Sequence, residues 1–202
     1  MADTNKIKYG IKNVFYAVAT IAANGSATYQ TPVALPGAVS LSMDPQGEME
    51  PFYADNIQYY VSVLNDGYEG NLELAKVPDS FLTDVLGYVA DANGVLYENA
   101  NAPAVHFALL FQFEGDVHAR RGVLYNCTAT RPTVGGSTKE AQISPETQTI
   151  PIRATSVYNA AVDKDVVKAS VTPSEATQYN AWTTTVYQPV ASGGRSPGRQ
   201  ED

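Results

Sequence analysis

The sequence is poor in the residues that carry most enzyme and metal chemistry. Its 202 residues include one cysteine, Cys127, and two histidines, His106 and His118. A single cysteine excludes an intrachain disulfide and a cysteine-based metal cluster, and it is consistent with synthesis in a reducing cytoplasm. The sequence has no phosphate-binding loop, no dinucleotide-binding fingerprint and no EF-hand. We therefore expect no catalytic residue, no metal ligand and no cofactor, which argues against an enzyme.

Positive charge and long apolar runs are also scarce. The chain has 13 Lys and Arg against 21 Asp and Glu, a formal net charge of −8. Proteins that hold phosphates by charge need the opposite balance, so DNA binding of that kind is disfavoured. There is no run of 18 apolar residues and no basic region followed by an apolar stretch at the start. We expect a soluble protein that is neither secreted through a signal peptide nor inserted in a membrane.

The sequence is rich in short β-branched and aromatic runs separated by Gly, Pro, Asn and Asp, which is typical of strands and turns. Hydrophobic residues make up 44% of the chain, enough to build a core. The expected class is mainly β, of the α+β kind. The expected strands span residues 13–19, 38–43, 57–64, 68–77, 94–98, 105–113, 117–130 and 148–157.

Two short segments predict antiparallel hairpins. Asn65-Asp66-Gly67 separates two expected strands, and its residues tolerate the positive φ that a tight turn needs. Glu114-Gly115-Asp116 separates another two, with a glycine available for the left-handed position.

One segment predicts a helix. After Pro78, apolar residues recur at helical spacing, and Asp79 is placed to act as the N-cap. These apolar residues are Phe81, Leu82, Val85, Leu86 and Val89. The helix should be amphipathic and cover one face or end of the sheet.

Residues 44–56 (DPQGEMEPFYADN) are expected to form a loop that contacts another surface. Three of them, Met49, Phe52 and Tyr53, are apolar groups that a solvated loop does not need, so another surface should cover them. The acidic residues Asp44, Glu48, Glu50 and Asp55 would surround them as a polar rim that selects basic partners. Residues 131–146 are expected to cross the surface, and residues 192–202 to form a flexible tail.

Each residue with possible chemistry also has a simpler interpretation. His106 and His118 lie on the two strands of an expected hairpin, where they could face each other near Asp116, but such pairs usually belong to an ordinary sheet surface. Cys127 lies in a strand pattern where a buried thiol is the usual outcome.

The four acids of residues 44–56 form a solvated face more often than a cation site. Arg120 and Arg121 should pair with acids on the same sheet or on a neighbouring subunit.

Three stretches taken together resemble the major tail proteins of siphophages that infect Gram-positive bacteria. The first is residues 8–16 (KYGIKNVFY), and the second is residues 66–87 (DGYEGNLELAKVPDSFLTDVLG). The third combines residues 111–117 (FQFEGDV) with residues 125–132 (YNCTATRP). With the spacing between them, these stretches cover about residues 8 to 160.

The resemblance implies a β-sandwich or barrel of the phage tail tube type with one flanking helix. Residues 1–191 would form the tube domain, with an N-terminal arm and with loop 44–56 reaching the adjacent ring. The assembly would be a virion tail tube of stacked hexameric rings, enclosing DNA that passes without specific binding. Its partners would be other copies of the chain, the tape measure protein, and tail terminator or baseplate proteins.

Two other classes of protein fit parts of the sequence. A carbohydrate-binding or adhesive β-sandwich would also be rich in tyrosine, acidic and without catalytic groups. A hydrolase would need two carboxylates, for example Glu69 and Glu73 on one face of a strand. Strand rise places those two roughly 13 Å apart, too far for a glycosidase pair. The carbohydrate-binding module is thus the main alternative to a tail tube.

Overall fold

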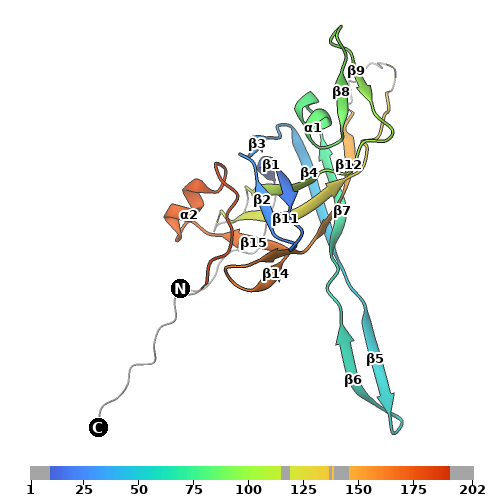
Figure 1. The fold of residues 1–202 in the computed structure, drawn as a ribbon, viewed down its shortest axis with the longest axis vertical. Coiled ribbons are helices and arrows are strands. Elements are labelled where there is room, and N and C mark those ends of the chain that lie inside the picture. The colour runs from blue at the N-terminus through green and yellow to red at the C-terminus, as the bar shows by residue number, and fades with distance from the viewer. Residues whose placement is uncertain (1–9, 115–118, 137, 139–145, 192–202) are drawn as a thin grey trace, which may run out of the picture.

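The computed structural model describes residues 10–114, 119–136, 138 and 146–191, which form one large antiparallel β-sheet with smaller ribbons attached (Figure 1). This confirms the prediction of a mainly β fold.

The elements fall into three groups. The main sheet contains β1 (Ile11–Ile21), β2 (Ala27–Tyr29), β3 (Val33–Ala34), β4 (Ala38–Gln46), β7 (Gly67–Leu74), β10 (His106–Phe113), β11 (Arg121–Ala129), β12 (Gln148–Thr155) and β15 (Lys168–Val171). Its strand order is β2-β1-β10-β11-β12-β7-β4, with β15 beside β11 and β3 beside β1. The ribbons pair β5 (Met49–Ala54) with β6 (Ile57–Val63), β8 (Tyr88–Ala90) with β9 (Leu96–Glu98), and β13 (Val157–Asn159) with β14 (Lys164–Val166). The helices are α1 (Asp79–Asp84) and α2 (Ala176–Ala181).

The sheet curls around its larger core. Strands β1 and β4 contact each other and both contribute apolar side chains to this core, so the sheet approaches a partly closed barrel. Helix α1 packs on it through Phe81, whose ring meets Tyr16 edge-on at 5.1 Å and Phe107 at 5.6 Å. As expected, α1 flanks the sheet.

A second core lies on the opposite face of the sheet, under the C-terminal segment. Leu110 and Tyr125 from the sheet pack with Trp182 and Val186, which follow α2. The sequence pattern did not predict α2, because its six residues (ATQYNA) show no apolar periodicity. Contacts with the distant sheet therefore stabilise this helix.

Buried tyrosines make the fold sensitive to alkaline pH. Tyr16 donates a hydrogen bond to Asp84 Oδ2 at 2.8 Å, and burial, aided by Asp84, raises its pKa to about 12. Burial also raises the pKa of Tyr29 and Tyr125. In the unfolded chain a tyrosine has a pKa of about 10. The folded state therefore holds its phenolic protons more tightly than the unfolded state.

Stability should accordingly fall as the pH rises from about 10 to about 12, because only the unfolded chain gains by losing these protons in that window. Denaturant unfolding followed by circular dichroism at a series of pH values would measure the fall. Tyr16→Phe should make it shallower, whereas Tyr59→Phe, at an exposed position, should not. Equal slopes for Tyr16→Phe and the parent protein would contradict this assignment.

The prediction for the helix was partly wrong. Pro78 occupies the N-cap position without a side-chain hydrogen bond, and Asp79 is the first helical residue. The helix ends at Asp84, and Gly87 adopts a positive φ of 71° that turns the chain away. Val89 therefore lies exposed in β8 and not on the helix face.

The antiparallel pairing predicted for the strands on either side of residues 114–116 is confirmed, since β10 pairs with β11, while residues 115–118 of the connection lie outside the described residues. The other predicted hairpin is wrong, because β6 pairs with β5 and β7 pairs with β4 and β12. The strands expected at 13–19, 38–43, 105–113 and 148–157 are present with shifted ends. His118, most of residues 139–146 and the predicted tail 192–202 lie outside the described residues.

Candidate functional site

The expected loop at residues 44–56 is instead the first half of a long β-hairpin. The pairing of β4 with β7 continues outward as Asp66 N–H donates to Gln46 O at 2.9 Å and Leu64 N–H donates to Glu48 O at 3.0 Å. The ladder then passes into β5 and β6. Residues 49–64, which we call the arm, project away from the body at one end of the molecule (Figure 1).

Local sequence explains this geometry. Asp55 and Asn56 have positive φ values of 52° and 60°, which makes them the two central residues of the hairpin turn. Pro45 and Pro51 lie in strands with a free edge, where a missing N–H is tolerated. The turn at Asp55 thus replaces the one predicted at Asn65-Asp66-Gly67.

Glycines fix the base of the arm. A Cβ on Gly47 would lie 2.1 Å from Leu64 O, and one on Gly67 would lie 2.0 Å from Ala154 O. Gly67 also has a positive φ of 96°. Only glycine allows the backbone at these two positions to approach its neighbouring strand this closely. The base of the arm is therefore packed against the body, whereas the arm beyond it projects outward.

The arm carries the largest concentration of exposed apolar side chains in the described part of the chain. Met49 is 71% exposed, Phe52 61% and Tyr53 64%. The arm holds eight of the fifteen exposed large hydrophobic residues, the others being Ile57, Tyr59, Tyr60, Val61 and Leu64. Exposed apolar side chains gathered in this way are typical of surfaces that another molecule covers.

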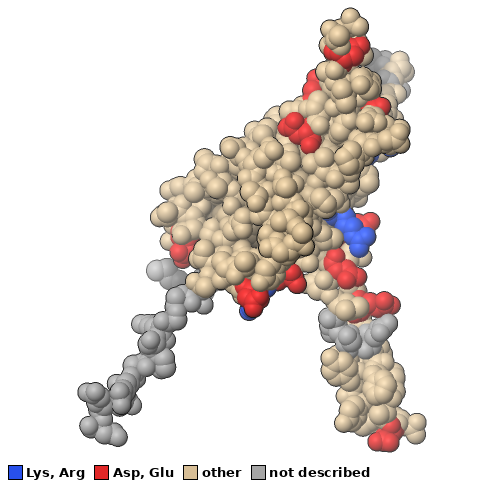
Figure 2. Space-filling view, viewed as in Figure 1, with Lys and Arg blue, Asp and Glu red and all other residues tan. Residues whose placement is uncertain are grey.

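The acidic residues of the predicted site are spread along the hairpin. Asp44 is exposed on β4, Glu48 lies at the base of the arm, Glu50 falls within β5, and Asp55 lies in the turn. Figure 2 shows acidic side chains at the tip of the arm and near its base. Strand rise of about 3.4 Å per residue separates Asp44 and Asp55 too widely to share a cation, and no cluster able to hold a metal occurs among the described residues.

Sequence patterns predicted only half of this surface. They placed Met49, Phe52 and Tyr53 in a loop, and they predicted residues 57–64 as a strand in a hairpin with residues 68–77. Tyr59 and Tyr60 are 72% and 63% exposed on β6. The available signal was the apolar run Tyr59-Tyr60-Val61, which lacks the alternation of a strand with one solvated face.

The other candidate residues have structural roles. His106 Nδ1 lies 2.7 Å from Oδ1 of Asn126, which belongs to the neighbouring strand β11. Cys127 is fully buried, and burial raises the pKa of its thiol, which keeps it protonated and unreactive. Neither residue has the surroundings of a nucleophile or a general base.

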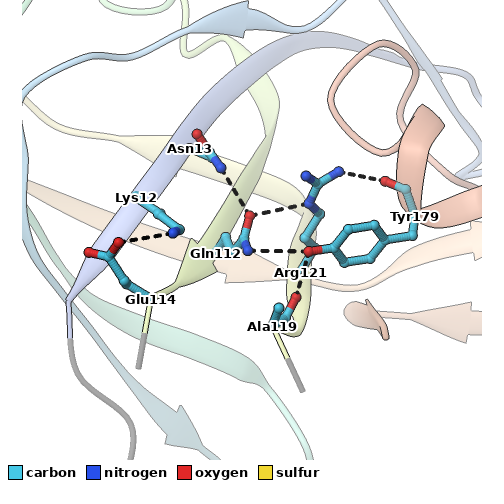
Figure 3. A network of polar contacts seen from close by, with 7 residues as sticks. All are labelled: Lys12, Asn13, Gln112, Glu114, Ala119, Arg121 and Tyr179. Carbon is cyan, nitrogen blue, oxygen red and sulfur yellow. Dashed lines mark hydrogen bonds and ion pairs between the residues drawn. The ribbon is translucent and has the colours of Figure 1, made fainter. Parts of the chain in front are cut away.

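Arg121 was expected to pair with an acid and binds neutral groups instead (Figure 3). Its Nε donates to Gln112 Oε1 at 3.2 Å, and its Nη1 donates to Tyr179 O at 2.5 Å. The guanidinium also stacks 4.0 Å from the centroid of the Tyr179 ring. Tyr179 OH in turn donates to Ala119 O at 3.0 Å. This network fastens α2 to the ends of β10 and β11.

No helix in the described ranges is long and apolar enough to cross a membrane. Comparison with curated proteins gives no match. Among solved structures, the tube-terminating cap of an anti-feeding prophage is similar at 12% identity and a TM-score of 0.34, over 85% of this chain and 99% of that one. The sequence profile of the phage tail tube proteins, a family named after a major structural protein of an L. lactis phage, matches residues 2–192. The chain therefore belongs to the phage tail tube protein family.

Proposed function

We propose that the chain assembles into hexameric rings that stack as a tube around the DNA channel, with the arm of each copy contacting the adjacent ring. Family membership makes the chain a structural component of the virion tail and not an enzyme. The single observation that carries the ring contact is the arm itself, a hairpin whose apolar side chains are exposed in the described part of the chain.

The arm by itself should be only marginally stable. A two-stranded ribbon without further packing is marginal in water. The arm keeps its apolar side chains exposed, including all three apolar residues predicted for the inter-ring contact, Met49, Phe52 and Tyr53. Its acids Asp44, Glu48, Glu50 and Asp55 would form the rim of that contact. Burial against another copy would supply the packing that the arm lacks.

The remaining parts of the proposal follow the family. Residues 1–191 would act as the tube domain and residues 192–202 as its tail. Its other partners would be the tape measure protein and the tail terminator or baseplate proteins of a siphophage of Gram-positive bacteria. Net negative charge would let DNA pass without specific binding, because fixed charge of the same sign discourages adhesion. Family membership favours this function over a carbohydrate-binding module.

The double variant Met49→Ser with Phe52→Ser tests the proposal. Both side chains are exposed in the single chain, so the free energy of unfolding should change by less than about 0.5 kcal/mol. Burying each apolar side chain between rings contributes about 1.5 kcal/mol or more, so the concentration needed for tubes should rise by at least about tenfold. Electron microscopy of a concentration series and thermal melting measure the two effects.

Val134→Ser is the matched control, since Val134 is 97% exposed outside the arm. It should change neither melting nor the concentration at which tubes form. A double variant that is destabilised as a monomer yet polymerises like the parent would refute the ring contact. Absence of tubes or rings of the parent protein at every concentration would refute the proposed assembly as a whole.

A further inference from the structure

The arm presents apolar side chains on both of its faces. Residues directly opposite each other in an antiparallel ribbon share a face, and successive residues of a strand alternate between faces. Pro51 lies opposite Val61, and Phe52 lies opposite Tyr60. The register shifts between Phe52 and Tyr53, where β6 has the extra residue Tyr59, so the faces are assigned from the regular strand β5 and its directly opposite partners. One face contains Met49, Pro51, Tyr53 and Val61, and the other contains Phe52, Ile57 and Tyr60.

Both faces are open to solvent in the single chain. Tyr53 on the first face and Tyr60 on the second are 64% and 63% exposed. The body sheet shows the contrasting pattern of a strand with one covered face. In β12, Ile150 and Ile152 are buried, whereas the intervening Pro151 is exposed. A ribbon that rested on one surface would keep its other face polar in the same way.

We propose that each arm inserts between two other copies of this chain, which cover its two faces separately. The inference rests on the proposed self-assembly and adds that one arm joins three copies. Contact with a single neighbour would leave one apolar face in water, at the cost that exposed apolar patches carry. Insertion between two neighbours buries both.

Charge points to a copy of this chain as the partner. Residues 44–66 include five acidic residues and no Lys or Arg. The body has a hollow of about 470 Å³ whose lining includes the apolar residues Phe111 and Phe113 and the basic residues Arg120 and Lys168. Lys168 Nζ lies 4.4 Å from the ring centroid of Tyr68, near the base of the arm. An apolar floor with basic neighbours complements an apolar ribbon with acidic neighbours.

The arm and this hollow are different surfaces of one chain. A contact between unlike surfaces repeats from copy to copy and builds rings or filaments instead of closed pairs. The hollow of one copy thus accommodates one face of a neighbour's arm. The second face of that arm stays exposed until another copy covers it.

Photo-crosslinking from each face tests the inference. Tyr53 and Tyr60 are replaced, singly and together, by p-benzoylphenylalanine, an aromatic residue that keeps the apolar ring. The modified chain is assembled with a large excess of the parent protein, so that each product contains one modified copy. Each single variant should give dimers on a denaturing gel, and the double variant should give trimers. Val134→p-benzoylphenylalanine should give neither above background.

Dimers from only one of the two positions, or no trimers from the double variant when both single variants crosslink, would overturn the two-sided contact. Tubes that form without crosslinks from either position would overturn it as well, and would leave assembly itself intact. Failure of the parent protein to form tubes, seen by microscopy before irradiation, would instead refute the proposed function.

Discussion

Excision of the arm is expected to leave a folded chain that forms no tubes. Gln46 and Asp66 are already joined by a backbone hydrogen bond of 2.9 Å, so an Asn-Gly turn can replace residues 47–65 and close the remaining hairpin. The core residues nearest the cut, Leu72 and Leu74, are fully buried in the body. The free energy of unfolding should therefore stay within about 1 kcal/mol of the parent value, because loop shortening has a small entropic effect.

Assembly should respond very differently. The deletion removes all eight exposed apolar side chains of the arm. If those groups join adjacent rings, no tubes should appear at concentrations where the parent protein polymerises completely. Sedimentation and negative-stain microscopy measure this, with melting as the test of folding. Tubes of normal length from the shortened chain would contradict the role assigned to the arm.

The shortened chain should also act as a terminator when mixed with the parent protein. It keeps the hollow lined by Phe111, Phe113 and Lys168 but has no arm to offer to the next copy. A small fraction of it should shorten parent tubes without changing the total amount of folded protein. A variant that also carries Lys168→Glu is the matched control, since its hollow has lost a basic neighbour. It should shorten tubes less.

Sequence patterns predicted the central strands well, because their signals are local and strong. β10 and β11 combine long apolar runs with a glycine-containing connection, and they pair as expected. The arm was mistaken because two turn signals compete within residues 44–67. Asn65-Asp66-Gly67 is the stronger signal by composition, yet Asp55-Asn56 forms the turn. Gly67 instead lies where a Cβ would meet Ala154 O at 2.0 Å, a close approach between distant segments that no local pattern reveals.

The C-terminal segment that covers the second core also could not be predicted from local sequence patterns. α2 is only six residues long, below the length at which a helix is stable by itself. Its position depends on Arg121, which reaches Tyr179 from a strand 58 residues away in sequence. The candidate site was likewise predictable from local sequence only in part. The composition of residues 44–56 predicted an apolar contact surface, but the pairing that presents it on two faces required the structure.

Trp182→Ala is expected to produce the largest loss of stability among single substitutions near the C-terminus. Trp182 is 2% exposed, its Nε1–H donates to Gly122 O at 3.2 Å, and its ring stacks on Tyr187 at 5.5 Å. Truncation of a buried tryptophan leaves a cavity and usually lowers the free energy of unfolding by about 3–5 kcal/mol. It also leaves Gly122 O without its donor. The second core should therefore open before the first.

Urea unfolding followed by circular dichroism is the right measurement, because Trp182 is the only tryptophan and its removal abolishes the fluorescence signal. Trp182→Phe is the matched control. It keeps an aromatic ring against Tyr187 but loses the hydrogen bond to Gly122 O, so its cost should be about 1–3 kcal/mol and smaller than that of alanine. If alanine costs less than about 1 kcal/mol, the segment after α2 does not pack on the sheet in solution. The face formed by Leu110 and Tyr125 would then be open, and the tube domain would end well before residue 191.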